Sequence, residues 1–289
     1  GMEIADLTGI GNFTKLTALD CSDNQLTTLD LSDAAMLAKL DCSGNGTLES
    51  LTLPEPMQLG GISMPGSMLT VLDCSDCALS SLSLDNCIVL GELNCSGNQL
   101  TELDTRYCQG LKELNCADNR LDTLSLIWEK SLVILDCSGN LLKSLRLTGN
   151  PALETLNCSG NQLTALSVSS NTALTGLNCA KNQITQLDLS KNTSLASLDC
   201  SGNQLTDLNT YVMQYTQDLD CSDNLFTRLD VRSCGMLETF SCQGNQLMEL
   251  NLSASGKYHA LSLTAIGEGY VGYAMEQKED GATTYTAVA

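Results

Sequence analysis

The sequence of 289 residues is poor in aromatic, basic and histidine side chains. Aromatic residues make up 4% of it, so the large side chains that usually anchor protein interfaces are scarce. It has 14 Lys and Arg residues against 34 Asp and Glu residues, a formal net charge of −20 at pH 7. So acidic a chain repels nucleic acid and anionic lipid. No stretch approaches the roughly 18 apolar residues of a membrane span, so we expect neither nucleic-acid binding nor membrane insertion of this chain.

Cysteine, by contrast, is abundant and regularly spaced. Eleven of the fifteen cysteines lie 21 residues apart, except for one step of 32 residues between Cys42 and Cys74. A strict period of this size predicts a solenoid, in which each repeat forms one coil that stacks on the next. We call these eleven the ladder cysteines: Cys21, Cys42, Cys74, Cys95, Cys116, Cys137, Cys158, Cys179, Cys200, Cys221 and Cys242.

The residues around each ladder cysteine follow the pattern LxxLxCxxNxL, as in Leu90 to Leu100. This is the leucine-rich repeat signature with cysteine in place of its third leucine. Apolar and polar residues alternate as in a strand with one buried face, so stacked coils build a parallel β-sheet on the concave face. The rest of each coil is mostly Ser, Thr, Asn and β-branched residues, which form helices poorly. We therefore expect a leucine-rich repeat solenoid of 21-residue repeats, with extended or turn structure and little helix on the convex face.

An asparagine stands three residues after nearly every ladder cysteine. The chain turns sharply after each strand, and a buried Asn amide can satisfy both the N–H and the C=O groups left there. We expect this structural role for the whole row, in which Cys77 is the exception. The row comprises Asn24, Asn45, Asn98, Asn119, Asn140, Asn161, Asn182, Asn203, Asn224 and Asn245.

The ladder cysteines are expected to be reduced core residues. Neighbours in register on parallel strands lie about 4.8 Å apart with parallel Cα–Cβ bonds, which does not suit an unstrained disulfide. Cys74 and Cys77 form a CxxC pair, but no second pair or histidine cluster accompanies it, so we expect no metal and no cofactor. Cys87, Cys108 and Cys234 share a register on the convex side, and a disulfide between Cys87 and Cys108 is left open.

We expect one domain with three parts. Residues 1–20 supply an N-terminal half-coil cap, residues 21–263 the solenoid, and residues 264–289 a β-rich, hairpin-like C-terminal cap or the start of a following module. Residues 54–68 hold three of the four prolines, which predicts a loop that bulges from the solenoid without interrupting its stack. Tyr258, Leu261 and Leu263 occupy repeat positions in the last, degenerate coil.

Two segments carry a resemblance to a known family. Residues 195–206 (LASLDCSGNQLT) and 187–193 (LDLSKNT) resemble the cysteine-ladder leucine-rich repeats of bacterial surface proteins of the internalin J type. The resemblance implies an extracellular, secreted or cell-surface adhesion module that binds another macromolecule.

The residues that alternate with the ladder positions face solvent on the strand side. An Asp or Asn stands immediately before ten of the ladder cysteines, and a Ser usually follows two residues later. These residues can bond to one another in a purely structural role. The carboxylates also repel one another, and a cationic partner or bound calcium would relieve that repulsion, although no calcium-loop motif is present. The candidate binding residues of this row are Asp136, Asp199 and Asp220.

A more variable row lies three residues before each ladder cysteine. Its candidate binding residues, with two neighbours beside the row, are Lys39, Glu92, Glu113, Asp218, Lys112 and Glu154. On the convex side, Tyr107 and Trp128 share a register on adjacent coils, where they form a contact patch or pack on each other. Tyr211 interrupts a later coil in the same way.

These patterns favour a non-catalytic, monomeric module that binds a protein or glycan ligand, of which a cationic one fits the acidic rows. The alternatives are the recruiting or spacer region of a larger surface enzyme. Catalysis needs a nucleophile, a base and oxyanion donors converging on one pocket. Uniform coils offer no such pocket, and the single histidine, His259, lies in the degenerate coil.

Overall fold

The computed structural model describes residues 2–59, 62–63, 66–252, 260–262, 272–277 and 283–288, with side chains described within 2–57 and 66–252. The chain divides into two compact units, Gly1–Ala152 and Leu153–Ala289. We call them unit 1 and unit 2. The predictions for Tyr258, His259 and Leu263 lie outside the described residues.

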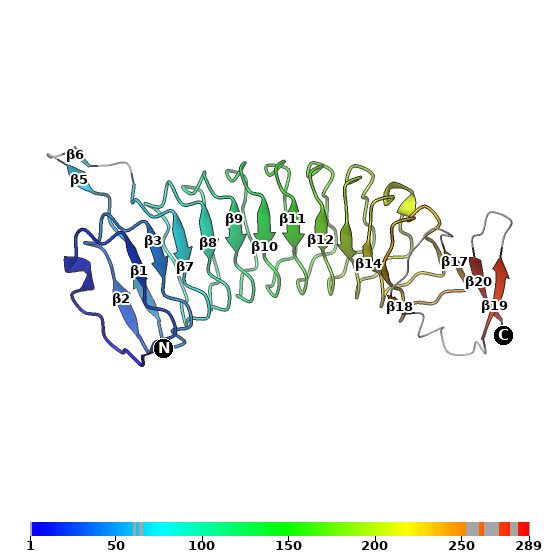
Figure 1. Ribbon diagram of the computed structural model, residues 1–289, viewed down its shortest axis with the longest axis horizontal. Coiled ribbons are helices and arrows are strands. Elements are labelled where there is room, and N and C mark those ends of the chain that lie inside the picture. Colours follow the sequence, from blue (N-terminus) through cyan, green and yellow to red (C-terminus); the bar gives the residue numbers. More distant parts are fainter. Residues whose placement is uncertain are drawn as a thin grey trace. The chain divides into compact units, whose positions relative to one another are not determined.

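Unit 1 is built on a parallel sheet with one short strand for each coil (Figure 1). Each strand pairs in register with the next, so that Leu40 lies opposite Leu72 and Leu72 opposite Leu93. These central leucines are at most 2% exposed, while the residues on either side reach solvent in the alternation expected of a half-buried strand. The strand order is β1 (Ala18–Asp20), β3 (Lys39–Asp41), β7 (Val71–Asp73), β8 (Glu92–Asn94), β9 (Glu113–Asn115) and β10 (Ile134–Asp136).

Unit 2 repeats the same parallel arrangement. Its last coils place Leu219 opposite Phe240 and Phe240 opposite Leu261, so Leu261 occupies the repeat position predicted for it. The strand order is β11 (Thr155–Asn157), β12 (Gly176–Asn178), β13 (Ser197–Asp199), β14 (Asp218–Asp220), β16 (Thr239–Ser241) and β18 (Ala260–Ser262). We call the solvent-facing side of these strands the strand face in both units.

The rest of each coil, which we call the return, is extended or turn structure. Among the described residues, the helical segments are two 3-10 turns, η1 (Ile10–Asn12) and η2 (Thr210–Val212). Short parallel pairs also form on the return: β2 (Thr28–Asp30) with β4 (Ser50–Thr52), and β15 (Arg228–Asp230) with β17 (Glu249–Leu252). The predicted leucine-rich repeat solenoid, with very little helix, is confirmed.

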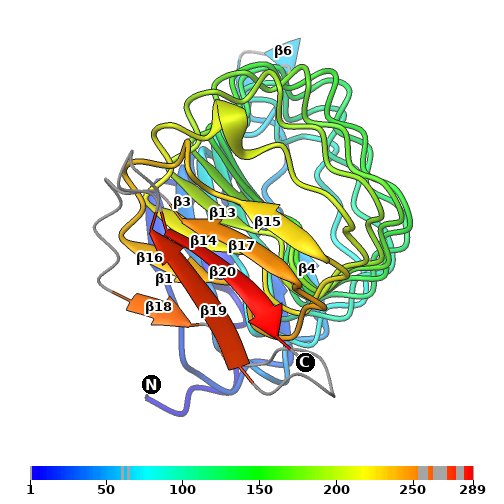
Figure 2. The ribbon, with the colours of Figure 1, turned by 90° about the vertical axis from the view of Figure 1, so that its right-hand side faces the viewer.

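Two segments depart from the repeat. The insertion carries a short antiparallel pair, β5 (Gln58–Leu59) and β6 (Ile62–Ser63), while β3 pairs directly with β7 across it, so the stack is not interrupted. At the C-terminal end, β19 (Gly272–Gln277) and β20 (Thr283–Val288) form the antiparallel hairpin expected there. Figure 2 shows β15, β17, β20 and β19 side by side, with β20 antiparallel to β17.

All fifteen cysteines are buried free thiols, including Cys87 and Cys108. Burial raises the pKa of the Cys21 thiol to about 11 and that of Cys116 to about 12. At Cys200 burial holds the pKa well above its usual range. The ladder is therefore a protonated, apolar part of the core.

The asparagine row ties consecutive coils together. Asn98 Nδ2 lies 2.8 Å from the carbonyl oxygen of Cys74, one coil earlier, and 3.1 Å from that of Cys95 in its own coil. Its Oδ1 accepts a hydrogen bond from the backbone nitrogen of Leu79 at 3.0 Å. Because donor and acceptor are both used, the backbone groups of the turn stay satisfied although they are buried. The same pattern occurs at Asn45, Asn119, Asn140, Asn182, Asn203, Asn224 and Asn245.

Cys77 can replace asparagine because the preceding coil holds one extra residue. In other coils, the backbone nitrogen at the position of Leu48 donates to the next asparagine. Here Leu48 N donates instead to the carbonyl oxygen of Asn45 within its own turn, at 2.8 Å. No acceptor is therefore needed from residue 77, and the Cys77 thiol supplies only a weak donor, 3.4 Å from the carbonyl oxygen of Cys42.

The residue two positions after each ladder cysteine has a left-handed φ, and in unit 1 it alternates between Asp and Gly from coil to coil. In unit 1, Asp76 and Asp118 have φ of 51°, and Gly97 and Gly139 on the coils after them have φ of 63° and 62°. A Cβ atom added to Gly139 would lie 2.1 Å from Asp118 Oδ1 and 3.1 Å from its Cγ. The Asp side chain of one coil therefore occupies the space that a side chain on the next coil would need.

Replacing Gly139 by Ala should lower the free energy of unfolding by about 2–3 kcal/mol. Left-handed φ costs a residue with a Cβ about 1–2 kcal/mol, and Asp118 must also turn away. The double variant Asp118→Gly/Gly139→Ala should recover the steric part. Urea unfolding of the wild type, both single variants and the double variant measures the coupling. Strictly additive effects would contradict the proposed contact.

Candidate functional site

The aspartates before the ladder cysteines are hydrogen-bonded to the serines that follow. Asp41 Oδ1 lies 2.6 Å from Ser43 Oγ and 3.0 Å from its backbone nitrogen. One carboxylate oxygen thus caps the turn after the strand, which is the structural role considered for this row. The same Oγ–Oδ1 distance of 2.6 Å occurs at the candidate binding residues, in the pairs Asp136–Ser138, Asp199–Ser201 and Asp220–Ser222.

These carboxylates also stand in register on neighbouring strands. Asp20 lies opposite Asp41, and Asp41 opposite Asp73. Hydrogen bonds from Ser22 lower the pKa of Asp20, and Asn94 Nδ2 donates to Asp73 Oδ2 at 3.0 Å. Local bonding therefore offsets part of the repulsion between the carboxylates. Within the part of the chain that the structure describes, no three His, Cys, Asp or Glu residues are grouped to hold a metal ion.

The more variable row is exposed on the strand face. In unit 1, Glu92 lies directly opposite Glu113, and Lys112 is exposed beside them. Lys39 is exposed two strands away from Glu92, opposite Val71. The structure therefore brings two carboxylates of this row together in unit 1.

The two candidates of unit 2 are exposed as well. Asp218 accepts a hydrogen bond from Thr239 Oγ1 on the neighbouring strand, which holds its carboxylate along the sheet. Glu154 is exposed just before β11.

The two predicted aromatic residues, Trp128 and Tyr107, differ in whether they line a hollow of unit 1. Trp128 is 52% exposed and, with Ile127, lines a hollow of about 460 Å³ on the return. The hollow is also lined by Asp104 and Arg106, whose Nη2 lies 2.7 Å from Asp104 Oδ2. Tyr107 is 45% exposed and is not among the described residues that line this hollow.

A buried carboxylate holds the chain beside Trp128. Glu129 is 0% exposed; its Oε1 accepts a hydrogen bond from Thr105 Oγ1 at 2.7 Å, and its Oε2 one from the Trp128 backbone nitrogen at 3.0 Å. Asn150 Nδ2 donates to the Glu129 carbonyl oxygen at 2.9 Å. The sequence analysis did not predict this group, although two signals were present. Thr105 stands at a position that is otherwise apolar, and Glu129 stands in a row of Cys and Asn.

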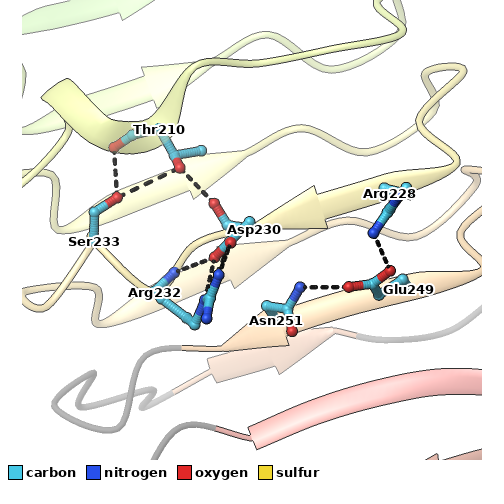
Figure 3. A network of polar contacts seen from close by, with 7 residues as sticks. All are labelled: Thr210, Arg228, Asp230, Arg232, Ser233, Glu249 and Asn251. Carbon is cyan, nitrogen blue, oxygen red and sulfur yellow. Dashed lines mark hydrogen bonds and ion pairs between the residues drawn. The ribbon is translucent and has the colours of Figure 1, made fainter.

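A larger hollow, of about 850 Å³, lies on the return of unit 2 and was not predicted (Figure 3). Arg232 and Asp230 form a fork in which Nε lies 2.9 Å from Oδ1 and Nη2 lies 2.5 Å from Oδ2. Arg228 Nη2 lies 2.6 Å from Glu249 Oε2. Asn251 Nδ2 donates to Glu249 Oε1 at 3.0 Å. Paired charged groups thus line one side of the hollow.

The 3-10 turn η2 forms the adjoining wall of this hollow. Thr210 is buried; its Oγ1 donates to the carbonyl oxygen of Asp230, and its own carbonyl oxygen accepts from Ser233 Oγ at 2.9 Å. Asn209 Oδ1 accepts from the Tyr211 backbone nitrogen at 3.2 Å. These bonds anchor a turn that leaves the Tyr211 side chain 76% exposed at the hollow. The sequence held one signal of this turn: Tyr211 stands at a position where the three preceding coils carry Thr or Ser.

The coils and their ladder define a class: the chain is a leucine-rich repeat solenoid with cysteine at the third consensus position. Among solved structures it is similar to the functional domain of InlJ from Listeria monocytogenes, which includes a cysteine ladder. Identity is 24% over 99% of this chain and 83% of that chain, with a TM-score of 0.53. It is also similar to an internalin, InlF, from the same organism, with 21% identity over 86% and 73% and a TM-score of 0.71.

A third similar structure is a plant peptide hormone receptor, RGFR1, in complex with RGF2. Identity is 23% over 82% of this chain and 41% of that chain, with a TM-score of 0.62. No family model and no curated protein matches the chain. The predicted resemblance to internalin-type repeats is thus confirmed in the fold. Among the described residues, no helix is long and apolar enough to cross a membrane.

Proposed function

We propose that the chain is a non-catalytic recognition module that binds a basic partner protein through its strand face. The observation that carries the proposal is the pair Glu92 and Glu113, which lie in register and exposed on adjacent strands. The asparagine bonds beneath them hold the coils in place, so the backbone that carries the pair has little freedom to lose on binding. The net charge of −20 would steer a basic partner towards this face.

We further propose that the module works as a monomer at a bacterial surface or in secreted form. The resemblance of residues 187–206 to bacterial surface proteins supports this location. Free thiols are uncommon in oxidising surroundings, but here every cysteine is buried, which protects it from oxidants. The complex of RGFR1 with RGF2 supports a binding role, because it shows a similar fold engaged with a ligand.

Reversing both charges, Glu92→Lys/Glu113→Lys, should weaken binding of a basic partner by about tenfold or more, mainly through slower association. Partners would be selected from a displayed library of extracellular protein domains, and their affinities measured by biolayer interferometry at low and high salt. The matched control is Glu49→Lys/Asp122→Lys, which changes the net charge equally at exposed positions of unit 1 away from the strand face. Equal loss in both double variants would contradict a site on the strand face.

A further inference from the structure

The hollows on the returns of the two units share a construction. Each contains an Asp and an Arg two residues apart, at the ninth and eleventh positions after a ladder cysteine: Asp104 with Arg106, and Asp230 with Arg232. In both, the Arg Nε donates to Asp Oδ1 at 2.9 Å. Each hollow also has one large exposed aromatic side chain among its lining residues, Trp128 or Tyr211. The Asp–Arg pair therefore occurs twice on one register of the repeat, whereas the aromatic side chain comes from the following coil at Trp128 and from the preceding coil at Tyr211.

Most of the charged groups in the larger hollow are paired with one another. Its lining holds the carboxylates of Asp207, Asp230 and Glu249 and the guanidinium groups of Arg228 and Arg232. Two of the carboxylates are paired with the two guanidinium groups (Figure 3). The site thus has little excess charge to select a charged ligand. What it offers is a set of planar hydrogen-bonding groups held in fixed orientations, which suit adjacent hydroxyl groups.

Most of the Tyr211 side chain lies outside the packed core. Tyr211 is 76% exposed, yet the turn that carries it is anchored by the buried Thr210 and by Asn209. An exposed aromatic ring on an anchored turn, next to polar groups, presents an apolar face and a hydroxyl together. Such a ring can pack against the C–H face of a sugar while neighbouring groups bond its hydroxyls.

We propose that the hollow lined by Tyr211, Asp230, Arg232 and Glu249 is a binding site for neutral carbohydrate. The inference rests on the proposed function only in taking the chain as a recognition module, because the site lies on the return and not on the strand face. A volume of about 850 Å³ accommodates a short oligosaccharide. The smaller hollow beside Trp128 offers the same contacts to one or two sugar units.

The test is an array of neutral oligosaccharides built from hexoses, deoxyhexoses and N-acetylhexosamines, with sialylated and sulfated counterparts and a peptide array beside it. The full chain should bind one or more neutral members, with an affinity that changes less than about twofold between 50 and 500 mM NaCl. Tyr211→Ala should raise the Kd about tenfold or more, and Arg232→Gln should raise it as well. Tyr215→Ala is the matched control, since Tyr215 is 62% exposed and outside the hollow.

Several results would overturn the proposal. These are binding of charged glycans or peptides alone, no binding to any neutral oligosaccharide, or neutral binding that Tyr211→Ala leaves unchanged while a thermal melt shows the variant folded. The variant Glu92→Lys/Glu113→Lys should retain carbohydrate binding. Loss of protein binding in that variant with carbohydrate binding intact would therefore separate this site from the strand face.

Discussion

Raising the pH from about 8 to about 11 should unfold the protein steeply. Burial raises the pKa of thirteen thiols, for example to about 11 at Cys234 and to about 12 at Cys108. In the unfolded chain these thiols lose their protons near pH 8.5, whereas the folded chain keeps them. The stability that the protonated thiols give the folded chain is thus fully present below the thiol pKa of the unfolded chain. It is lost as the pH rises towards the higher thiol pKa of the folded chain. Each thiol lowers the free energy of unfolding by about 1.4 kcal/mol per pH unit in that window.

The measurement is urea unfolding at a series of pH values, followed by circular dichroism, with thiolate absorbance recorded in parallel. Thiolate should appear together with loss of structure. Replacing Cys95 and Cys116 by Ala lowers stability at neutral pH, but it should reduce the alkaline slope by about 2.8 kcal/mol per pH unit, since two thiols are removed. Thiolate absorbance that rises near pH 8.5 while the circular dichroism stays native would contradict the prediction.

Replacing Asn98 by Ala should lower the free energy of unfolding by about 3–9 kcal/mol. Its amide satisfies the backbone nitrogen of Leu79 and the carbonyl oxygens of Cys74 and Cys95, all buried. Each group left without a partner costs about 1–3 kcal/mol. A solenoid passes the damage to neighbouring coils, because each coil is stabilised mainly by those beside it.

The converse substitution, Cys77→Asn, should give no gain although it restores the repeat consensus. Leu48 N already donates to the carbonyl oxygen of Asn45, so the introduced amide oxygen would be buried with no donor supplied by that turn. Urea unfolding of Asn98→Ala, Cys77→Asn and Cys77→Ala compares the positions directly. A rise in stability of more than about 1 kcal/mol in Cys77→Asn would contradict the explanation given for the exception.

The fold could be predicted from sequence because every coil buries the same positions. The period at Leu93 and Cys95 defines the strand and its buried face, and a buried amide at Asn98 has one obvious use. The position of Trp128 on the return could also be predicted, from its register in the repeat, but its exposure was left open against packing on Tyr107. These inferences depend on local geometry that repeats, so each coil supports the others.

The hollows could not be predicted because they depend on departures from the repeat. Whether Glu129 is exposed or buried depends on Thr105, which lies one coil earlier and offers it a hydroxyl. The fork between Asp230 and Arg232 depends on side-chain rotamers that no periodicity encodes. Tyr211 stands at a register that is exposed in preceding coils as well, as at Ser169 and Ser190, but its place at a hollow depends on the side chains of the next coil. Such sites depend on pairs of coils, whereas the sequence pattern describes one coil at a time.

In unit 1, the alternation of Asp and Gly at the left-handed turn makes two coils, or 42 residues, the natural step for changing the number of coils. Losing a single coil from unit 1 could bring Asp76 directly beneath Asp118, where the structure has room only for the bare glycine at 97. Losing two consecutive coils restores an aspartate beneath a glycine. Duplication and deletion of coils within unit 1 would thus be tolerated best in even numbers, and a library of shortened or lengthened versions of this unit should be built in the same increments.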